Sequence, residues 1–204
     1  MIPLKDTVPA KNQPWVTYGI IVLNFLVFLL ELTIEQDQIE TFFRSYGVVP
    51  TSMDLNEPGM WSLFLSSMFL HGGVAHFIGN MWTLWIFGDN VEDKMGPIRY
   101  LIFYILCGIL AGLVHYFLNI NSNLPAIGAS GAISGVMAAY MILFPKSRII
   151  FLIPIFIFPL LFEISAFVYI AIWFAGQLLS GTAFLIASPS AASIAFWAHI
   201  GGFL

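Results

Sequence analysis

The sequence predicts an all-α membrane protein built as a bundle of six transmembrane helices. Hydrophobic residues make up 59% of the 204 residues and charged residues only 9%, whereas soluble domains carry about 25% charged residues. The mean hydropathy is +0.91, and the chain has too few polar residues to cover a water-soluble fold. Its length accommodates about six apolar segments of roughly 20 residues joined by short loops.

The composition also excludes several classes of function. Seven Lys and Arg against eleven Asp and Glu give a net charge of −4, so the chain lacks the basic patch that nucleic-acid binding requires, and no nucleic-acid partner is expected. The single cysteine, Cys107, rules out an intrachain disulfide. His71 and His76 lack the glutamate and the spacing of a zinc-protease helix, so no metal is expected.

The apolar segments are divided by polar stretches and glycines. After a cytoplasmic N-terminal segment, residues 1–14, the predicted spans are residues 15–34, 73–88, 97–118, 125–144, 164–181 and 193–204. A secretory signal peptide is the alternative for the first run, but that run is long and lacks a small-residue cleavage site. Residues 61–71 are separated from the second span at Gly72-Gly73 and predict a short interfacial or partly embedded helix.

The last third of the chain is harder to divide. Residues 149–162 number only fourteen and contain Pro154 and Pro159, which predicts an interfacial or re-entrant segment rather than a span. No loop separates them from residues 164–181, so we expect a single span there. As a helix, residues 193–204 rise only about 18 Å, which predicts that the last helix is truncated within the membrane.

The basic residues agree with this count of spans and orient it. They precede the first span, flank the connection between the second and third, or lie between the fourth and fifth: Lys5, Lys11, Lys94, Arg99, Lys146 and Arg148. Alternating spans place all of them on one side, which the positive-inside rule identifies as the cytoplasm. Only Arg44 falls on the other side. We therefore expect a multi-pass protein with a cytoplasmic N-terminus.

Polar residues within the predicted spans mark a candidate site, because such residues are costly in lipid. His76 and Asn80 lie in the second span, Ser130 in the fourth and His199 in the sixth. All three spans run inward, and a rise of 1.5 Å per residue places the four residues about 5–10 Å below the outer surface. The sequence therefore predicts one site that opens to the extracytoplasmic side.

The chemistry of these residues fits acyl transfer. Ser130 lies in Gly128-Ala129-Ser130-Gly131 at a predicted helix start, where glycines permit close approach and free N–H groups face an oxyanion. A serine needs a neighbouring base, and His199 is available for that role. His76 and Asn80, four residues apart, share a helix face and can donate to an oxyanion. No Asp or Glu lies in the outer halves of these spans, which favours a Ser–His dyad over a triad.

Several of these residues have structural interpretations as well. Serines near small residues often mediate helix packing in membranes, and Ser134, one turn after Ser130, is a rival nucleophile. His71 fits a structural role in pinning the loop above the second span. His115 fits a solvated interfacial position.

Glycines predict a close contact between the fourth and sixth spans. Gly131 and Gly202 fit a seam of small residues that sets the distance between the two helices. Gly201 lies about 100° around the helix from Gly202, so an alanine there is expected to be milder than a bulky residue at Gly202.

At these residues the sequence resembles the rhomboid family of intramembrane serine proteases. The resemblance extends from Trp15 to Leu204 and is strongest in residues 69–80 (FLHGGVAHFIGN), 128–132 (GASGA) and 197–203 (WAHIGGF). Tyr46–Pro50 in the first loop is similar too. A GxSG motif alone is unspecific, but together with a preceding His-xxx-Asn and a following Ala-His-xx-Gly it is highly specific.

The resemblance implies a bacterial-type six-helix core in an inner or plasma membrane, open to the extracytoplasmic side. It implies Ser130 as the nucleophile and His199 as the general base, with His76, Asn80 and the Ser130 N–H around the oxyanion. Family substrates are transmembrane helices of other proteins in the lipid bilayer, cut near small or helix-breaking residues without a cofactor. Ser134 stands where many members carry a bulky aromatic residue beneath the catalytic histidine.

An intramembrane serine endopeptidase is therefore the first functional hypothesis. The alternative is an inactive rhomboid-like protein that binds membrane clients, but such relatives usually lack the pair that Ser130 and His199 form here. A transporter or channel predicts ionisable residues near mid-membrane and inverted repeats, and the sequence shows neither.

Overall fold

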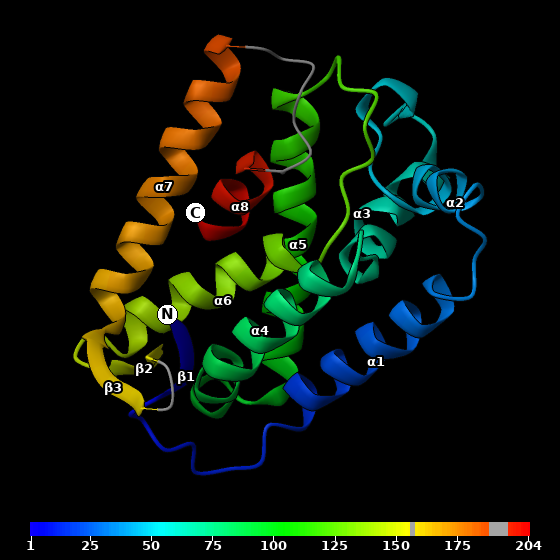
Figure 1. Cartoon of the computed structure of the whole chain (residues 1–204). Coiled ribbons are helices and arrows are strands. Elements are labelled where there is room, and N and C mark those ends of the chain that lie inside the picture. The colour runs from blue at the N-terminus through cyan, green and yellow to red at the C-terminus, as the bar shows by residue number, and fades with distance from the viewer. Residues whose placement is uncertain (156–157, 188–195) are drawn as a thin grey trace.

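The computed structural model describes residues 1–155, 158–187 and 196–204, and most of this part is helical (Figure 1). The longer helices are α1 (Trp15–Glu31), α4 (Val74–Met95), α5 (Pro97–Leu118), α6 (Ser130–Leu143) and α7 (Ala166–Ala187). The short helix α8 (Phe196–Phe203) packs against α5, α6 and α7.

The outer faces of the helices are apolar, as expected for a membrane protein. Large apolar side chains on them are exposed, among them Leu26, Ile142, Ile172 and Leu179. Within the described residues, α5 and α7 are long and apolar enough to cross a membrane. The pair Pro58–Phe69 and Val74–Met95, bent by 86°, adds a third candidate if it is one span, while α1 and α6 are shorter. The count of six spans stays a prediction.

Several helix limits differ from the predicted spans. The first helix ends at Glu31 rather than at residue 34, and the second continues to Met95. The segment predicted as a span from residue 125 is helical only from Ser130, because Gly128 has a φ of +124° and interrupts any helix before it. The predicted start of the last span, near residue 193, lies outside the described residues.

Short helices connect α1 to α4. They are α2 (Ile39–Tyr46), η1 (Pro50–Ser52), η2 (Pro58–Trp61), α3 (Ser62–Ser66) and η3 (Ser67–Phe69). The last three correspond to the short helix predicted at residues 61–71. The chain then turns sharply into α4, which accounts for the bend in the broken pair.

Residues 149–162, predicted to be an interfacial or re-entrant segment rather than a span, are extended rather than helical in their described part, and their place at a membrane interface stays a prediction. Strands β2 (Arg148–Ile155) and β3 (Phe158–Ser165) pair antiparallel, and β1 (Ile2–Asp6) pairs with the other side of β2. A short apolar run does not by itself distinguish a strand from a helix. The β-branched and aromatic residues of this run favour a strand.

The N-terminal segment is fastened to one end of the bundle. The Asp6 carboxylate accepts hydrogen bonds from Asn90 in α4, at 2.9 Å, and from Tyr140 in α6, and Asp93 accepts one from Asn12 at 2.6 Å. Burial raises the pKa of Asp6, and the Tyr140 hydrogen bond opposes that rise. The segments that carry Lys5, Lys11, Lys94, Arg99, Lys146 and Arg148, here called the grouped basic residues, therefore lie at the same end of the molecule.

Candidate active site

Ser130 and His199 come together between α6 and α8. Ser130 is the first residue of α6, and its hydroxyl oxygen lies 2.8 Å from Nε2 of His199 in α8. Both side chains are half-buried. At this distance the hydroxyl can donate to Nε2, which places a base where it can take the serine proton.

Glycines set the distance between these two helices. A Cβ on Gly202 would overlap the backbone carbonyl of Gly131, and one on Gly135 would lie 2.7 Å from the carbonyl oxygen of Gly202. On its other side, Gly131 faces α5, where a Cβ would lie 2.5 Å from that of Ala111. Small residues allow membrane helices to approach this closely. The seam predicted from the sequence is therefore present.

Gly201 is a contact point as well, and the milder effect expected of an alanine there stays a prediction. A Cβ at this position would lie 2.5 Å from the Cβ of Val114 in α5. Gly201 and Gly202 are both contact points, each with a different neighbouring helix, because α8 packs against α5 as well as α6.

His76 and Asn80 face the approach to Ser130. A Cβ on Gly128 would lie 2.7 Å from Nε2 of His76 and 3.6 Å from Nδ2 of Asn80. Asn80 is 7% exposed, and its Nδ2 has no hydrogen-bond partner within the described residues. A buried donor without an acceptor is costly, so the arrangement suits an acceptor supplied by a ligand. Gly128 leaves that space open because it has no side chain.

The coil that leads into α6 is held by the first loop. The N–H of Gly128 donates to the Ser67 carbonyl at 2.8 Å, and Val48 forms an antiparallel β-bridge with Ala126. The Tyr46–Pro50 stretch, although far from this coil in the sequence, thus supports it by backbone pairing. Because Ser130 begins α6, its own N–H has no acceptor within the helix and can serve an oxyanion.

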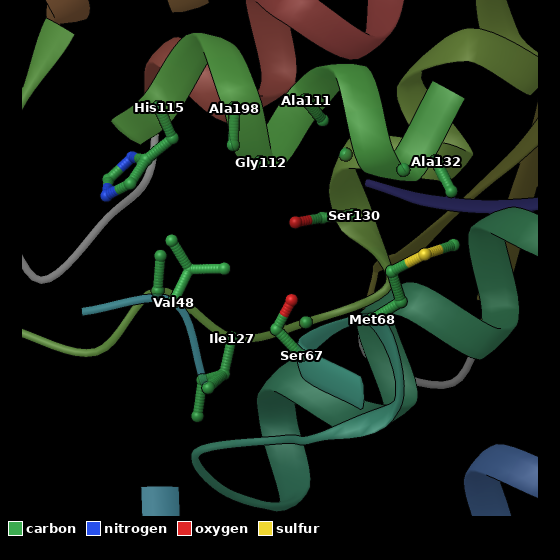
Figure 2. Close-up of a pocket in the computed structure, with 14 residues that line it drawn as sticks. Val48, Ser67, Met68, Ala111, Gly112, His115, Ile127, Ser130, Ala132 and Ala198 are labelled. Atoms are coloured by element: carbon green, nitrogen blue, oxygen red, sulfur yellow. The ribbon is translucent and has the colours of Figure 1, made fainter. Parts of the chain in front are cut away.

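A small cavity adjoins Ser130, whose side chain points into it (Figure 2). Its volume is about 30 Å³, which is enough for a water molecule or a small side chain. Most of its lining is small or apolar, including Val48, Ala111, Gly112, Ile127, Ala132 and Ala198.

His115 also lines this cavity, and the prediction that it is solvated is wrong. It is only 8% exposed, and it shares the lining of the cavity with Val48 and Ala126. Ser134, the rival nucleophile, is fully buried, and its hydroxyl donates to the Ser130 carbonyl at 2.6 Å. That hydroxyl is therefore engaged within α6.

His71 lies in the loop before α4, next to the site. It is 1% exposed, its backbone N–H donates to the Glu31 carboxylate at 3.0 Å, and its ring meets the ring of His76 edge-on at 5.2 Å. Glu31, at the end of α1, was not among the predicted residues. It ties the loop that precedes His76 to the first helix.

Sequence reasoning also missed Gln177 in α7. Its Oε1 lies 2.7 Å from Nδ1 of His199, the ring nitrogen that does not face Ser130. Trp173, one turn earlier, packs against the same imidazole with ring centroids 5.8 Å apart. The sequence does contain a signal for Gln177, because a glutamine within a predicted span is as unusual as His76, Asn80, Ser130 and His199 are in theirs.

Fold and site together define a class of protein: an apolar helical bundle with a serine–histidine pair held between its helices. A profile of the Rhomboid domain matches residues 58–204. The chain therefore belongs to the rhomboid family.

Relatives carry the same family name. Rhomboid protease GluP of Bacillus subtilis (strain 168) is 34% identical over 143 residues, which cover 70% of this chain and 27% of that protein. The mitochondrial presenilin-associated rhomboid-like protein of Mus musculus is 31% identical over 204 residues, covering 96% of this chain and 47% of that protein. The chain thus spans about half, or less, of the length of these curated relatives.

Proposed function

We propose that this protein is an intramembrane serine endopeptidase that cleaves transmembrane segments of other membrane proteins. The observation that carries the proposal is the 2.8 Å contact between the Ser130 hydroxyl and Nε2 of His199. Membership of the rhomboid family supports it, as does the name of the Bacillus subtilis relative, a rhomboid protease.

The reaction follows from the geometry of the site. The Ser130 hydroxyl attacks the carbonyl carbon of the scissile peptide bond while Nε2 of His199 takes its proton. The negative oxygen that forms accepts hydrogen bonds from Asn80, His76 and the backbone N–H of Ser130. His199 then donates the proton to the leaving amine, and an ester remains on Ser130.

A water molecule completes the cycle. His199 takes a proton from the water as it attacks the ester, and returns that proton to the Ser130 oxygen when the acid product leaves. These steps need proton transfer and oxyanion stabilisation alone, so the proposal includes no cofactor.

The shape of the site bears on the substrate. A cavity of about 30 Å³ beside Ser130 suits a small side chain next to the scissile bond. A helix-breaking residue nearby would help, because a peptide bond inside a helix is protected by its backbone hydrogen bonds. Both features are expected of the transmembrane segments that this protein cleaves.

We also propose that α1, α4, α5, α6, α7 and α8 are the spans, with a cytoplasmic N-terminus and an extracytoplasmic active site. In support of this topology, the grouped basic residues lie at the end of the bundle that holds β1 and β2. The coil at residues 119–129, which leads to Ser130, begins at the other end of α5 (Figure 1).

The test is labelling and cleavage in proteoliposomes. A fluorophosphonate should label the wild-type protein, which should also cut a reporter transmembrane helix, and Ser130→Ala should lose both activities. Ser134→Ala is the matched control and should keep both, because its hydroxyl is engaged within α6. Cleavage by Ser130→Ala at the wild-type rate would refute the assignment, and reporter binding without labelling or cleavage would indicate the inactive, client-binding alternative.

A further inference from the structure

We infer that Gln177 is a positioning residue that holds His199 in the tautomer and orientation needed to activate Ser130. The inference rests on the proposed function of Ser130 and His199. Its structural basis is the 2.7 Å contact between Oε1 of Gln177 and Nδ1 of His199, on the side of the ring opposite Ser130.

The contact with Gln177 bears on which ring nitrogen of His199 carries the hydrogen. A neutral imidazole carries one N–H, on either ring nitrogen. To accept the serine proton, Nε2 of His199 must be bare, so the hydrogen must sit on Nδ1. A hydrogen on Nδ1 needs an acceptor, and the amide oxygen of Gln177 provides one at hydrogen-bond distance. The contact therefore stabilises the one tautomer that can act as a base.

The support for the ring comes from α7 rather than α6. Ser134, the residue of α6 one turn below Ser130, is too small to reach the imidazole, and its hydroxyl is bound to the Ser130 carbonyl. Trp173 packs against the ring, and Gln177 follows it by one turn of the same helix. Two side chains of α7 therefore hold His199, one by packing and one by a directed hydrogen bond.

A neutral amide suits this environment better than a carboxylate. In a Ser–His–Asp triad a carboxylate orients the histidine, but an ionised group in an apolar bundle carries a large desolvation cost. Gln177 accepts the same hydrogen bond without a charge. Among the described residues, the ionisable groups that act electrostatically on His199 are His76 of α4 and His115 of α5.

The test compares two replacements of similar length. Gln177→Met keeps the bulk but removes the amide oxygen, and kcat for a reporter helix should fall on the order of 10²-fold with little change in KM. Gln177→Glu keeps an acceptor and adds a charge that favours the imidazolium. It should retain more activity than Gln177→Met at neutral pH, and the acid limb of its pH–rate profile should move to higher pH.

Controls separate this inference from the proposed function. Thr182→Val removes a hydroxyl that, among residues whose structure is described, bonds to its own helix alone, and it should behave as wild type. If the wild type cleaves and Ser130→Ala does not, a wild-type kcat in Gln177→Met overturns the role of Gln177 and leaves the proposed function standing. If Gln177→Met does not fold, Gln177→Glu still decides: an acid limb identical to that of the wild type overturns the inference. Activity in Ser130→Ala would instead refute the proposed function.

Discussion

At the scale of single residues, Asn80 combines a buried position with a side-chain donor that is unpaired within the described residues. Its Nδ2 is buried near Gly128 without a partner in the described chain, and an unpaired buried donor costs about 1–3 kcal/mol. The oxyanion of a tetrahedral intermediate would supply the missing acceptor. The same reasoning applies to His76, whose Nε2 faces the same space.

Replacing Asn80 by alanine should therefore separate activity from stability. Removing one oxyanion donor typically lowers kcat by about 10²–10³-fold, and we expect that loss with a smaller change in KM. The melting temperature in detergent should stay the same or rise, because the side chain of Asn80 makes no hydrogen bond within the described part of the chain. Asn121→Ala, at an exposed position, is the control for both measurements. A joint loss of kcat and melting temperature would point to a structural role instead.

At the scale of elements, the contact between α6 and α8 decides whether Ser130 and His199 meet. The contact is made by backbone against backbone at Gly131 and Gly202, and a backbone atom cannot rotate aside as a side chain can. Any side chain at Gly202 must therefore push α8 away from α6.

Gly202→Ala should insert into the membrane and yet cleave poorly. A displacement of about 1 Å in an active site can cost roughly 10²-fold in rate, and a Cβ here requires at least a shift of that kind. The loss should appear in kcat and in the rate of fluorophosphonate labelling. Gly176→Ala in α7, where a Cβ would meet nothing within 4 Å, should show neither loss. Full activity in Gly202→Ala would mean that the helices adjust without moving the dyad.

At the scale of the whole molecule, the fold separates two ends. One end carries the small β-sheet and the grouped basic residues, and the other carries the coil that leads back to Ser130 (Figure 1). If the first end is cytoplasmic, the site opens on the opposite side of the membrane.

Cysteine accessibility tests this orientation. In a Cys107→Ser background, a cysteine at Asn121 should react with a membrane-impermeant maleimide added to intact cells, and one at Lys146 should not. Both positions are exposed, so both should react after solubilisation, which serves as the control. The reverse pattern would place the active site on the cytoplasmic side.

The sequence by itself determined the helical, apolar character of the chain, its family, and the residues that form the site's central pair. These features depend on composition and on single polar residues in apolar surroundings, which are visible one segment at a time. The close contact at Gly202 was predictable for the same reason. Gly131 and Gly202 lie at matching depths in two parallel helices, so these helices can be expected to approach each other there.

Other contacts between distant segments were decided by the tertiary structure alone. The strand at Ile2–Asp6 pairs with β2 from the far half of the chain, so that β2 becomes the middle strand of a three-stranded sheet. Gln177 and Val114 contact α8 because of how α7 and α5 are rotated about their own axes. Periodicity tells which residues share a helix face, but the rotation of each helix toward its neighbours is set by the packing of all of them at once.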